Sequence, residues 1–321
     1  MLEQILKRGP FHSGPLSIWR IENFGSAIPA GIRIPDGLPE LSDDDETPPP
    51  MVERGDGSVT LHFHDVGRFR IGFADRKITA FDIAPDTADC VIEHILNDHI
   101  APRLLAELGA LVLHASAVRF DDRIALFLGE TGAGKSTLAT SLHQAGQVLL
   151  GDDAVTVTRT PEHYLAQAVY PSLRLYPESI ERLIGAGATT APMADYSDKQ
   201  HVRLATRPPV TEPPLPLAAI FFLSGTTADG APARGVEVQP LQSTLACIKL
   251  VEQSFTLDPR DPQCAARRLA QLSQLALAVP AFTLSYPHDF SVLARVHAAI
   301  ADALNAPVPA MPVSHQEKCS Q

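Results

Sequence analysis

The segment GETGAGKST at residues 129–137 constrains this chain more than any other part of its sequence. It fits the pattern G-x-x-x-x-G-K-[ST], between an apolar run that predicts a strand (124–128) and a pattern that predicts a helix (136–144). The glycines allow a tight loop whose backbone N–H groups turn inward, and the start of the helix adds positive potential there. The segment therefore predicts a loop that cradles phosphate groups, with an empty glycine-rich turn as the alternative.

Each residue of this loop has an expected part in holding a nucleotide. Lys135 should reach the β- and γ-phosphates, and the hydroxyl of Ser136 should ligate Mg²⁺. Thr137 either helps to start the helix or touches an outer phosphate. ATP and Mg²⁺ are therefore the expected cofactors. The predicted nucleotide-binding residues are Gly129, Glu130, Thr131, Gly132, Ala133, Gly134, Lys135, Ser136 and Thr137.

Two adjacent acidic residues follow the loop closely. The run VLLGDD places Asp152 and Asp153 at the end of a predicted buried strand. Carboxylates at such a strand end hold Mg²⁺ or accept a proton, whereas the alternative is a solvated turn. Because adjacent side chains on a strand point to opposite sides, we expect the two acids to divide these tasks.

The negative charge of the chain is concentrated in one segment. The 321 residues carry a net charge of −11, and residues 36–56 hold eight acidic residues against one arginine. Like charges and the prolines of SDDDETPPP oppose packing, so we expect an exposed loop there, with a docking surface for a basic partner as the alternative. A nucleic-acid partner is not expected, because that function needs a basic face.

Other features of the sequence argue against several classes of protein. The four cysteines show no CxxC or zinc spacing, so a metal–thiolate site is not expected. His62 and His64 share one face of a predicted strand but have no third ligand nearby. The N-terminus lacks the apolar core of a signal peptide, and no apolar run is long enough to span a membrane. We therefore expect a cytoplasmic protein without membrane contact.

The first third of the chain predicts a small α+β region. Alternating apolar and polar residues in 57–83 predict strands. A helix should begin at Asp86 or Thr87, be interrupted at Pro102 and end at Gly109.

The remaining order of elements indicates an α/β fold class. Short apolar runs and helical patterns follow one another from residue 110 to 304, apart from a proline-rich connector at 207–216. We therefore predict an N-terminal α+β region at 1–109, a core at 110–304 and a disordered tail at 305–321.

Three segments together resemble the HPr kinase/phosphorylase family, whose fold is akin to that of phosphoenolpyruvate carboxykinase. They are LHASAV before the loop, GETGAGKST itself, and AGQVLLGDDAV after it. The histidine, the loop and the pair of aspartates occur in the family's order and approximate spacing. The resemblance is clear over residues 109–157 and weaker to about 304. It implies a P-loop core with a mixed sheet, like that of these two enzymes.

The resemblance also implies a reaction, the phosphorylation of a seryl hydroxyl. By position, Asp152 would accept the serine proton, and Asp153 would join Ser136 on Mg²⁺. His114 would lie near the transferring phosphate, and Lys135 would complete the catalytic set. These roles are implied by the family.

Two later segments, YPSLRLYPESIERL and YSDKQHVRL, also look like parts of the smaller relatives. They make Arg174, Lys199 and Arg203 candidates to hold phosphate or substrate, with ordinary surface bases as the alternative. Lys199 stands in a predicted polar loop, which suits a mobile flap over ATP. Ser116, two residues after His114, is a weaker polar candidate.

Two departures from the family bear on the substrate. The family carries a segment of the type LEIRGLG after the Asp-Asp strand, where this chain reads PSLRLYPES, and the N-terminal 110 residues do not resemble the usual N-terminal domain. The chain looks more like the HPr-kinase-like enzymes of peptide-tailoring clusters, including those that phosphorylate a serine of a lasso-peptide precursor. This resemblance implies a peptide or protein partner and, as often in the family, an oligomer.

Two other functions fit the same residues. A kinase for a small molecule, such as an amino acid or a sugar, would use the same site. A regulatory module that binds a nucleotide without catalysis would need only the loop.

Overall fold

The computed structural model describes residues 10–11, 14–27, 50–185, 188–194, 197–204, 212–226 and 232–306. The predicted acidic loop lies outside these residues over 36–49, and the predicted tail does so from 307 onward. Residues 207–211 of the predicted connector also lie outside them.

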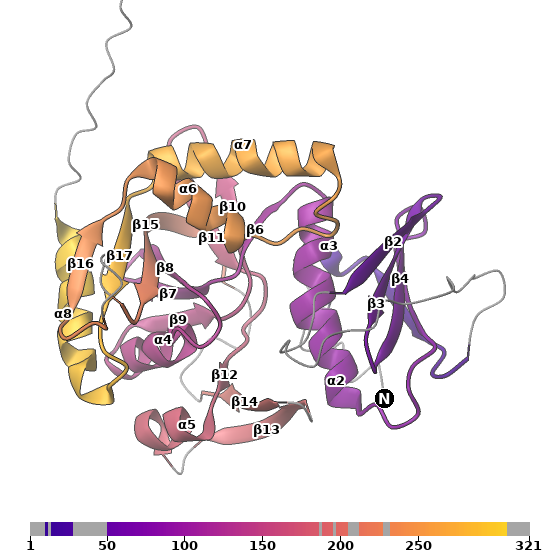
Figure 1. The fold of residues 1–321 in the computed structure, drawn as a ribbon, viewed down its shortest axis with the longest axis horizontal. Helices are drawn as coiled ribbons and strands as arrows, with labels where there is room; N and C mark the ends of the chain where they lie inside the picture. The colour runs from indigo at the N-terminus through magenta and orange to yellow at the C-terminus, as the bar shows by residue number, and fades with distance from the viewer. Residues whose placement is uncertain are drawn as a thin grey trace, which may run out of the picture.

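The N-terminal part of the chain forms a five-stranded sheet (Figure 1). The strands predicted in 57–83 are confirmed, and their apolar side chains lie in the core. The strand order is β1-β5-β4-β3-β2, with antiparallel neighbours except for the parallel pair β1–β5. The strands are β1 (Arg20–Asn23), β2 (Met51–Gly55), β3 (Ser58–Phe63), β4 (Gly67–Gly72) and β5 (Lys77–Phe81).

The prediction of an acidic loop is wrong for residues 51–55, because they form strand β2. This strand pairs with β3, and Val52 packs against the N-terminal apolar cluster. Arg54 forms ion pairs with Glu107 and Asp258 at 3.1 and 3.0 Å. The partial burial of Val52 and the ion pairs of Arg54 stabilise a strand in a segment whose composition indicates a loop.

A continuous helical segment packs on this sheet, between it and the core (Figure 1). It begins at Asp89, two or three residues later than predicted. Pro102 does not interrupt it. A wider π-helical stretch ends at Ile100, so the proline lies in the first turn of α3, where its missing N–H costs no intrahelical hydrogen bond. The parts are α2 (Asp89–His94), η2 (Ile95–Ile100) and α3 (Ala101–Glu107).

The core is a nine-stranded mixed sheet, which confirms the α/β class. Strand β15 is parallel to β8 and to β17, so all three end at the same edge. The order is β6-β10-β11-β15-β8-β7-β9, with β17 beside β15 and β16 beside β17. The strands are β6 (Leu111–Leu113), β7 (Ser116–Phe120), β8 (Arg123–Leu128), β9 (Val148–Gly151), β10 (Val155–Arg159), β11 (Tyr164–Ala168), β15 (Leu215–Ser224), β16 (Glu237–Pro240) and β17 (Ala281–Ser285).

Strand β15 begins inside the predicted connector. Leu215 and Pro216 pair with Ala166 and Leu165 of β11, and Leu215 packs against the core. The last two residues of the predicted connector therefore belong to the strand, because apolar contact outweighs the local effect of a proline at a strand end.

A bend in the core sheet creates the site described below. Strand β6 runs into β7, and β9 runs into β10, with residues 114–115 and 152–154 between them. The pair β6–β10 and the pair β7–β9 are both antiparallel. The register of β6–β10 continues across this gap to Ala117 and Gly151, and it then shifts by one residue, so that Val118 pairs with Leu149. Asp153 has a left-handed φ of 80°, which turns the chain at the gap. Ser116 is paired with Phe127, so the gap lies beside the end of β8.

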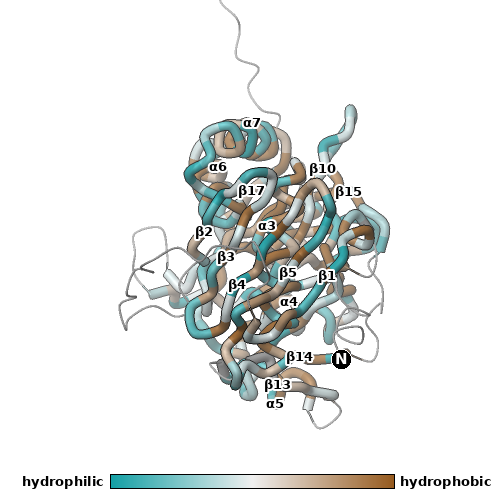
Figure 2. Tube along the Cα trace, turned by 90° about the vertical axis from the view of Figure 1, so that its right-hand side faces the viewer, coloured by the Kyte–Doolittle hydropathy of each residue, from teal (hydrophilic) through white to brown (hydrophobic). Residues whose placement is uncertain are grey.

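Helices cover both faces of the core sheet (Figure 1). Figure 2 shows apolar residues concentrated where these layers pack, with hydrophilic residues toward the outside. No helix in the described part of the chain is long and apolar enough to cross a membrane. One face carries α4 (Lys135–Gln144), the 3-10 turn η4 (Phe290–Val292) and α8 (Leu293–Asn305), and the other carries α6 (Ser243–Glu252) and α7 (Pro262–Ala278).

A three-stranded sheet lies below the core in Figure 1, in the order β12-β14-β13, beside helix α5. The prediction that Lys199 lies in a polar loop is wrong, because Lys199 belongs to β14, which is held by ladders on both sides. The elements are β12 (Arg174–Leu175), α5 (Pro177–Leu183), β13 (Thr189–Ala194) and β14 (Ser197–Arg203).

Candidate functional site

The glycine-rich loop lies between β8 and α4, as the sequence predicts. Gly132 and Gly134 have φ angles of 82° and 89°, a left-handed conformation that favours glycine. A Cβ atom on Gly129 would lie only 3.1 Å from the Cβ of Ala133 and 3.2 Å from the carbonyl oxygen of Leu223. Gly134 is the N-cap of α4 and offers no side chain to the first N–H groups of that helix. The loop therefore presents an uncapped helix start, which attracts anions.

Lys135 points back onto this loop. Its Nζ donates hydrogen bonds to the carbonyl oxygens of Gly129 at 2.7 Å and Glu130 at 3.1 Å, and the residue is only 7% exposed. Burial lowers the pKa of Lys135, while the carboxylates of Asp152 and Asp153 act in the opposite direction. A buried ammonium group therefore stands at the loop beside two carboxyl groups.

Asp152 lies in the gap between β9 and β10 and is 1% exposed. The hydroxyl of Ser116, across the gap, donates to its Oδ1 at 2.5 Å, while its Oδ2 is buried without a hydrogen-bond partner among the described residues. Burial and the neighbouring charge of Asp153 raise the pKa of Asp152, against hydrogen bonds from Ser116 and Ser136. The hydroxyl of Ser172 donates to the carbonyl oxygen of Asp152. The free Oδ2 is an atom suited to take a proton or a cation.

Asp153 points to a different partner, as expected for two neighbouring acids. Arg174 holds both carboxylate oxygens, with Nε 3.0 Å from Oδ2 and a second guanidinium nitrogen 2.5 Å from Oδ1. Burial alone would raise the pKa of Asp153, but the charge of Arg174 outweighs it and lowers that pKa below its usual range. Arg174 is thus placed to position Asp153, rather than standing as an isolated surface base.

His114 lies opposite this pair in the bend. Its Nδ1 donates to the carbonyl oxygen of Asp153 at 3.0 Å, and its ring meets Phe255 edge-on. Burial, aided by the charge of Lys135, lowers the pKa of His114 to about 4. The imidazole is therefore neutral at pH 7, and Nε2 is its free lone pair.

This shift predicts a pH dependence of stability. The folded state resists protonation of His114, so as pH falls from about 6.5 toward 4 only the unfolded chain gains this proton. Above pH 6.5 the neutral His114 therefore has no cost for the free energy of unfolding. Below pH 6.5 that free energy falls by up to about 1.4 kcal/mol per pH unit because of His114. Urea unfolding at pH 7 and pH 5 should show a smaller loss in His114→Gln than in the natural chain; equal losses would contradict the shift.

A buried polar network behind Arg174 could not be predicted from the sequence. His94 and Asp98 lie one helical turn apart on α2 and η2, with Nδ1 of His94 2.5 Å from Oδ2 of Asp98. Arg174 contacts both, at 3.1 Å to His94 and 3.5 Å to Asp98. Asp153 is therefore tied through Arg174 to the N-terminal helix. The i, i+4 spacing of a histidine and an acid was the only local signal.

The other predicted binding residues lie further out. Lys199 has its Nζ 5.2 Å from the ring centre of Tyr176, and its charge acts on the pKa of Lys135 and Asp153. Arg203 is exposed at the end of β14, paired with Thr189. The Thr137 hydroxyl lies 3.0 Å from that of Ser179 on α5. The structure thus brings Arg174 into the site, keeps Lys199 within electrostatic reach, and leaves Arg203 on the surface.

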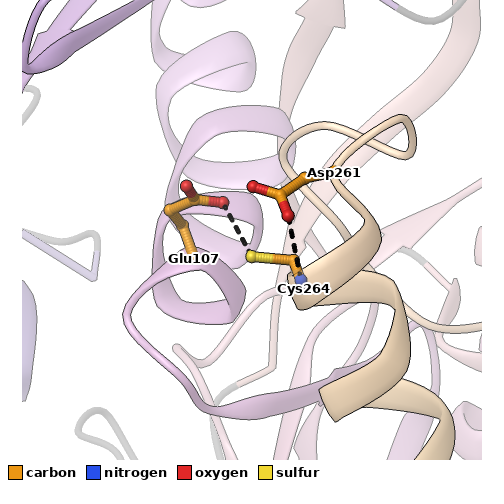
Figure 3. A group of neighbouring side chains, drawn as sticks. All are labelled: Glu107, Asp261 and Cys264. Atoms are coloured by element: carbon orange, nitrogen blue, oxygen red, sulfur yellow. Dashed lines mark hydrogen bonds between the residues drawn. The ribbon is translucent and has the colours of Figure 1, made fainter.

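One further group of possible metal ligands lies away from the loop, where Glu107, Asp261 and Cys264 offer atoms within 4.8 Å of one another (Figure 3). Arg54 pairs with both carboxylates, and Asp261 caps α7 by accepting from the backbone N–H of Cys264 at 3.1 Å. Burial raises the pKa of the Cys264 thiol, so it stays protonated. The group acts as a contact between α3 and the start of α7. His62 is buried beside Arg68, whereas His64 is exposed, so these two do not converge.

Comparison with known proteins gives little beyond this geometry. No family model matches the chain, and no curated protein matches it. One solved structure that matches is the Hpr(Ser) kinase/phosphatase from Coxiella burnetii, with 12% identity over 60% of this chain and 95% of that one, at a TM-score of 0.31. A TM-score of that size carries no argument, so the function below rests on the site.

Proposed function

We propose that this chain is an ATP- and Mg²⁺-dependent kinase that transfers the γ-phosphate to a hydroxyl group, with a serine of a peptide or protein, such as a lasso-peptide precursor, as acceptor. The observation that carries the proposal is the buried Oδ2 of Asp152, without a partner among the described residues, beside Lys135 and its loop. Phosphoryl transfer requires positioned phosphates, neutralised charge and a base for the acceptor proton. In this proposal the glycine-rich loop positions the phosphates, the ammonium group of Lys135 neutralises their charge, and the carboxylate of Asp152 is the base.

In this proposal Asp152 takes the proton of the acceptor hydroxyl. Burial raises its proton affinity, and Ser116 fixes its orientation through Oδ1, which leaves Oδ2 for the acceptor. The neutral His114 stands close by and fixes the backbone of Asp153. Lys135 and the open start of α4 stabilise the charge of the phosphates.

The residues present fit a Mg²⁺ ion. Ser136, Asp152 and Asp153 offer a hydroxyl and carboxylates, the hard oxygen ligands that this ion prefers, and Ser136 is close enough to lower the pKa of Asp152. We propose Ser136 and Asp153 as its holders. Because Arg174 now occupies both oxygens of Asp153, it would share that carboxylate with the ion. A bound Mg²⁺ neutralises phosphate charge.

Lys135→Ala tests the nucleotide site. Loss of the ammonium group is expected to weaken ATP binding by about 10-fold to 100-fold, because charged hydrogen bonds to phosphate disappear. Calorimetric titration with ATP and Mg²⁺ measures this. Lys77→Ala is the matched control, since Lys77 pairs with Glu22 on the N-terminal sheet. Unchanged affinity in Lys135→Ala would argue against the loop as the phosphate site.

The reaction itself is tested by incubating the protein with ATP, Mg²⁺ and candidate acceptors, and then detecting an added phosphate by mass spectrometry. Transfer to serine peptides supports the proposal, whereas transfer only to metabolites assigns a small-molecule kinase. ATP binding without transfer to any acceptor would indicate a nucleotide-binding module and would overturn it.

A further inference from the structure

A cavity of about 320 Å³ lies next to the glycine-rich loop. It is lined by loop residues 129–131, by His114, by the last residue of α6 and the segment 253–256 that follows it, and by Arg103 of α3. Its volume is in the range of small-molecule sites. Its walls come from both the core and the N-terminal helix. The wall formed by Arg103 and residues 253–256 contains no residue of the loop motif and neither of the two aspartates.

The position of the cavity relates it to the transferred phosphate. The Nζ of Lys135, the group that reaches the β- and γ-phosphates in such loops, contacts the carbonyl oxygens of Gly129 and Glu130. These two residues line the cavity, as does His114, which bonds the backbone of Asp153. The cavity therefore opens at the terminal-phosphate end of the loop, where an acceptor must enter.

Arg103 gives this cavity a chemical preference. One guanidinium nitrogen donates to the carbonyl oxygen of His99 at 2.9 Å, and the group lies 5.5 Å from the ring centre of Phe255. Burial lowers its pKa to about 10, so it remains charged at pH 7. No carboxylate in the described part of the chain forms an ion pair with it. A partly buried cation without a counter-ion is costly, and a ligand anion would compensate it.

We propose that this cavity is the acceptor subsite and that Arg103 binds a carboxylate carried close to the accepting hydroxyl. The inference rests on the proposed function and names its substrate class. Two sources share this chemistry, a free hydroxy acid such as serine and the C-terminal serine of a peptide. In the reaction the acceptor oxygen bonds to the γ-phosphorus, the bond from that phosphorus to the β–γ bridging oxygen breaks, ADP leaves, and the acceptor proton passes to Asp152.

The full chain is assayed with ATP, Mg²⁺ and five probes. These are free L-serine, L-serinamide, a peptide ending in serine with a free carboxylate, the same peptide amidated, and a peptide with an internal serine. Each is measured with the natural chain, Arg103→Gln, Arg103→Lys and Arg159→Gln. Arg159 is an exposed control whose side chain hydrogen-bonds only Gln274 among the described residues. Comparing the transfer rates to free serine and to the peptide with a free carboxylate shows which of the two carries the carboxylate that the cavity binds.

We expect a carboxylate probe to be phosphorylated in preference to its amide. Arg103→Gln should raise the KM for that probe by about 10-fold to 100-fold, with the KM for ATP unchanged. Arg103→Lys should recover part of the effect, and Arg159→Gln should show none. The comparison of acid with amide needs only the natural chain, so it decides the proposal even if Arg103→Gln fails to fold.

Three results separate this inference from the function on which it rests. Equal transfer to acids, amides and internal serines would overturn the subsite and leave the kinase intact, and so would a rise in the KM for ATP alone in Arg103→Gln. Transfer to no acceptor, together with normal ATP binding, would overturn the kinase and the subsite with it.

Discussion

In the Asp152→Asn variant, phosphoryl transfer is expected to fall by about 100-fold to 10,000-fold, while ATP binding stays nearly unchanged. The amide keeps the shape of the side chain and can still accept from Ser116, but it cannot take the acceptor proton. The buried Oδ2 is the atom at which this difference acts. Transfer rates at saturating ATP, together with calorimetric ATP affinities, measure the two effects separately.

Asp122→Asn is the matched control, because Asp122 is exposed in the turn between β7 and β8. It should transfer phosphate at the natural rate. Retained turnover in Asp152→Asn would exclude Asp152 as the base. If turnover and ATP affinity fell together, with a lower melting temperature, the role of Asp152 would be structural.

In the Arg174→Met variant, the free energy of unfolding is expected to fall by about 3–5 kcal/mol. Arg174 holds both oxygens of Asp153 and also contacts Asp98, and the side chains of these acids are only 12% and 4% exposed. Removing the guanidinium leaves buried carboxylates without their counter-ion. Urea unfolding at pH 7 measures the loss.

The double variant Arg174→Met/Asp153→Asn separates charge from packing. It should regain part of the lost stability, because residue 153 is then an uncharged amide and no longer a buried carboxylate without a counter-ion. Arg182→Met is the control, since its guanidinium is exposed on α5. A loss of stability in Arg174→Met no larger than in Arg182→Met would show that the ion pair does not hold the bend.

Local signals were enough to predict much of the core. The strand–loop–helix order around residues 129–137 follows from glycines that tolerate left-handed φ angles and from the apolar periodicity on both sides. The alternation in 57–83 predicts strands for the same reason. Where composition indicated a loop and tertiary contact decided otherwise, at residues 51–55 and at Lys199, the prediction was wrong.

By itself, then, the sequence determined the glycine-rich loop between a strand and a helix, the aspartates at a strand end and the alternating elements of an α/β chain, because each depends on residues close together along the chain. Only the tertiary structure decided that Ser116 faces Asp152, that Arg174 clamps Asp153, and that Arg103 closes a cavity beside the loop. These contacts join residues 21 to more than 100 positions apart. They depend on a bend in the sheet and on where the N-terminal helix packs, which are properties of the whole core.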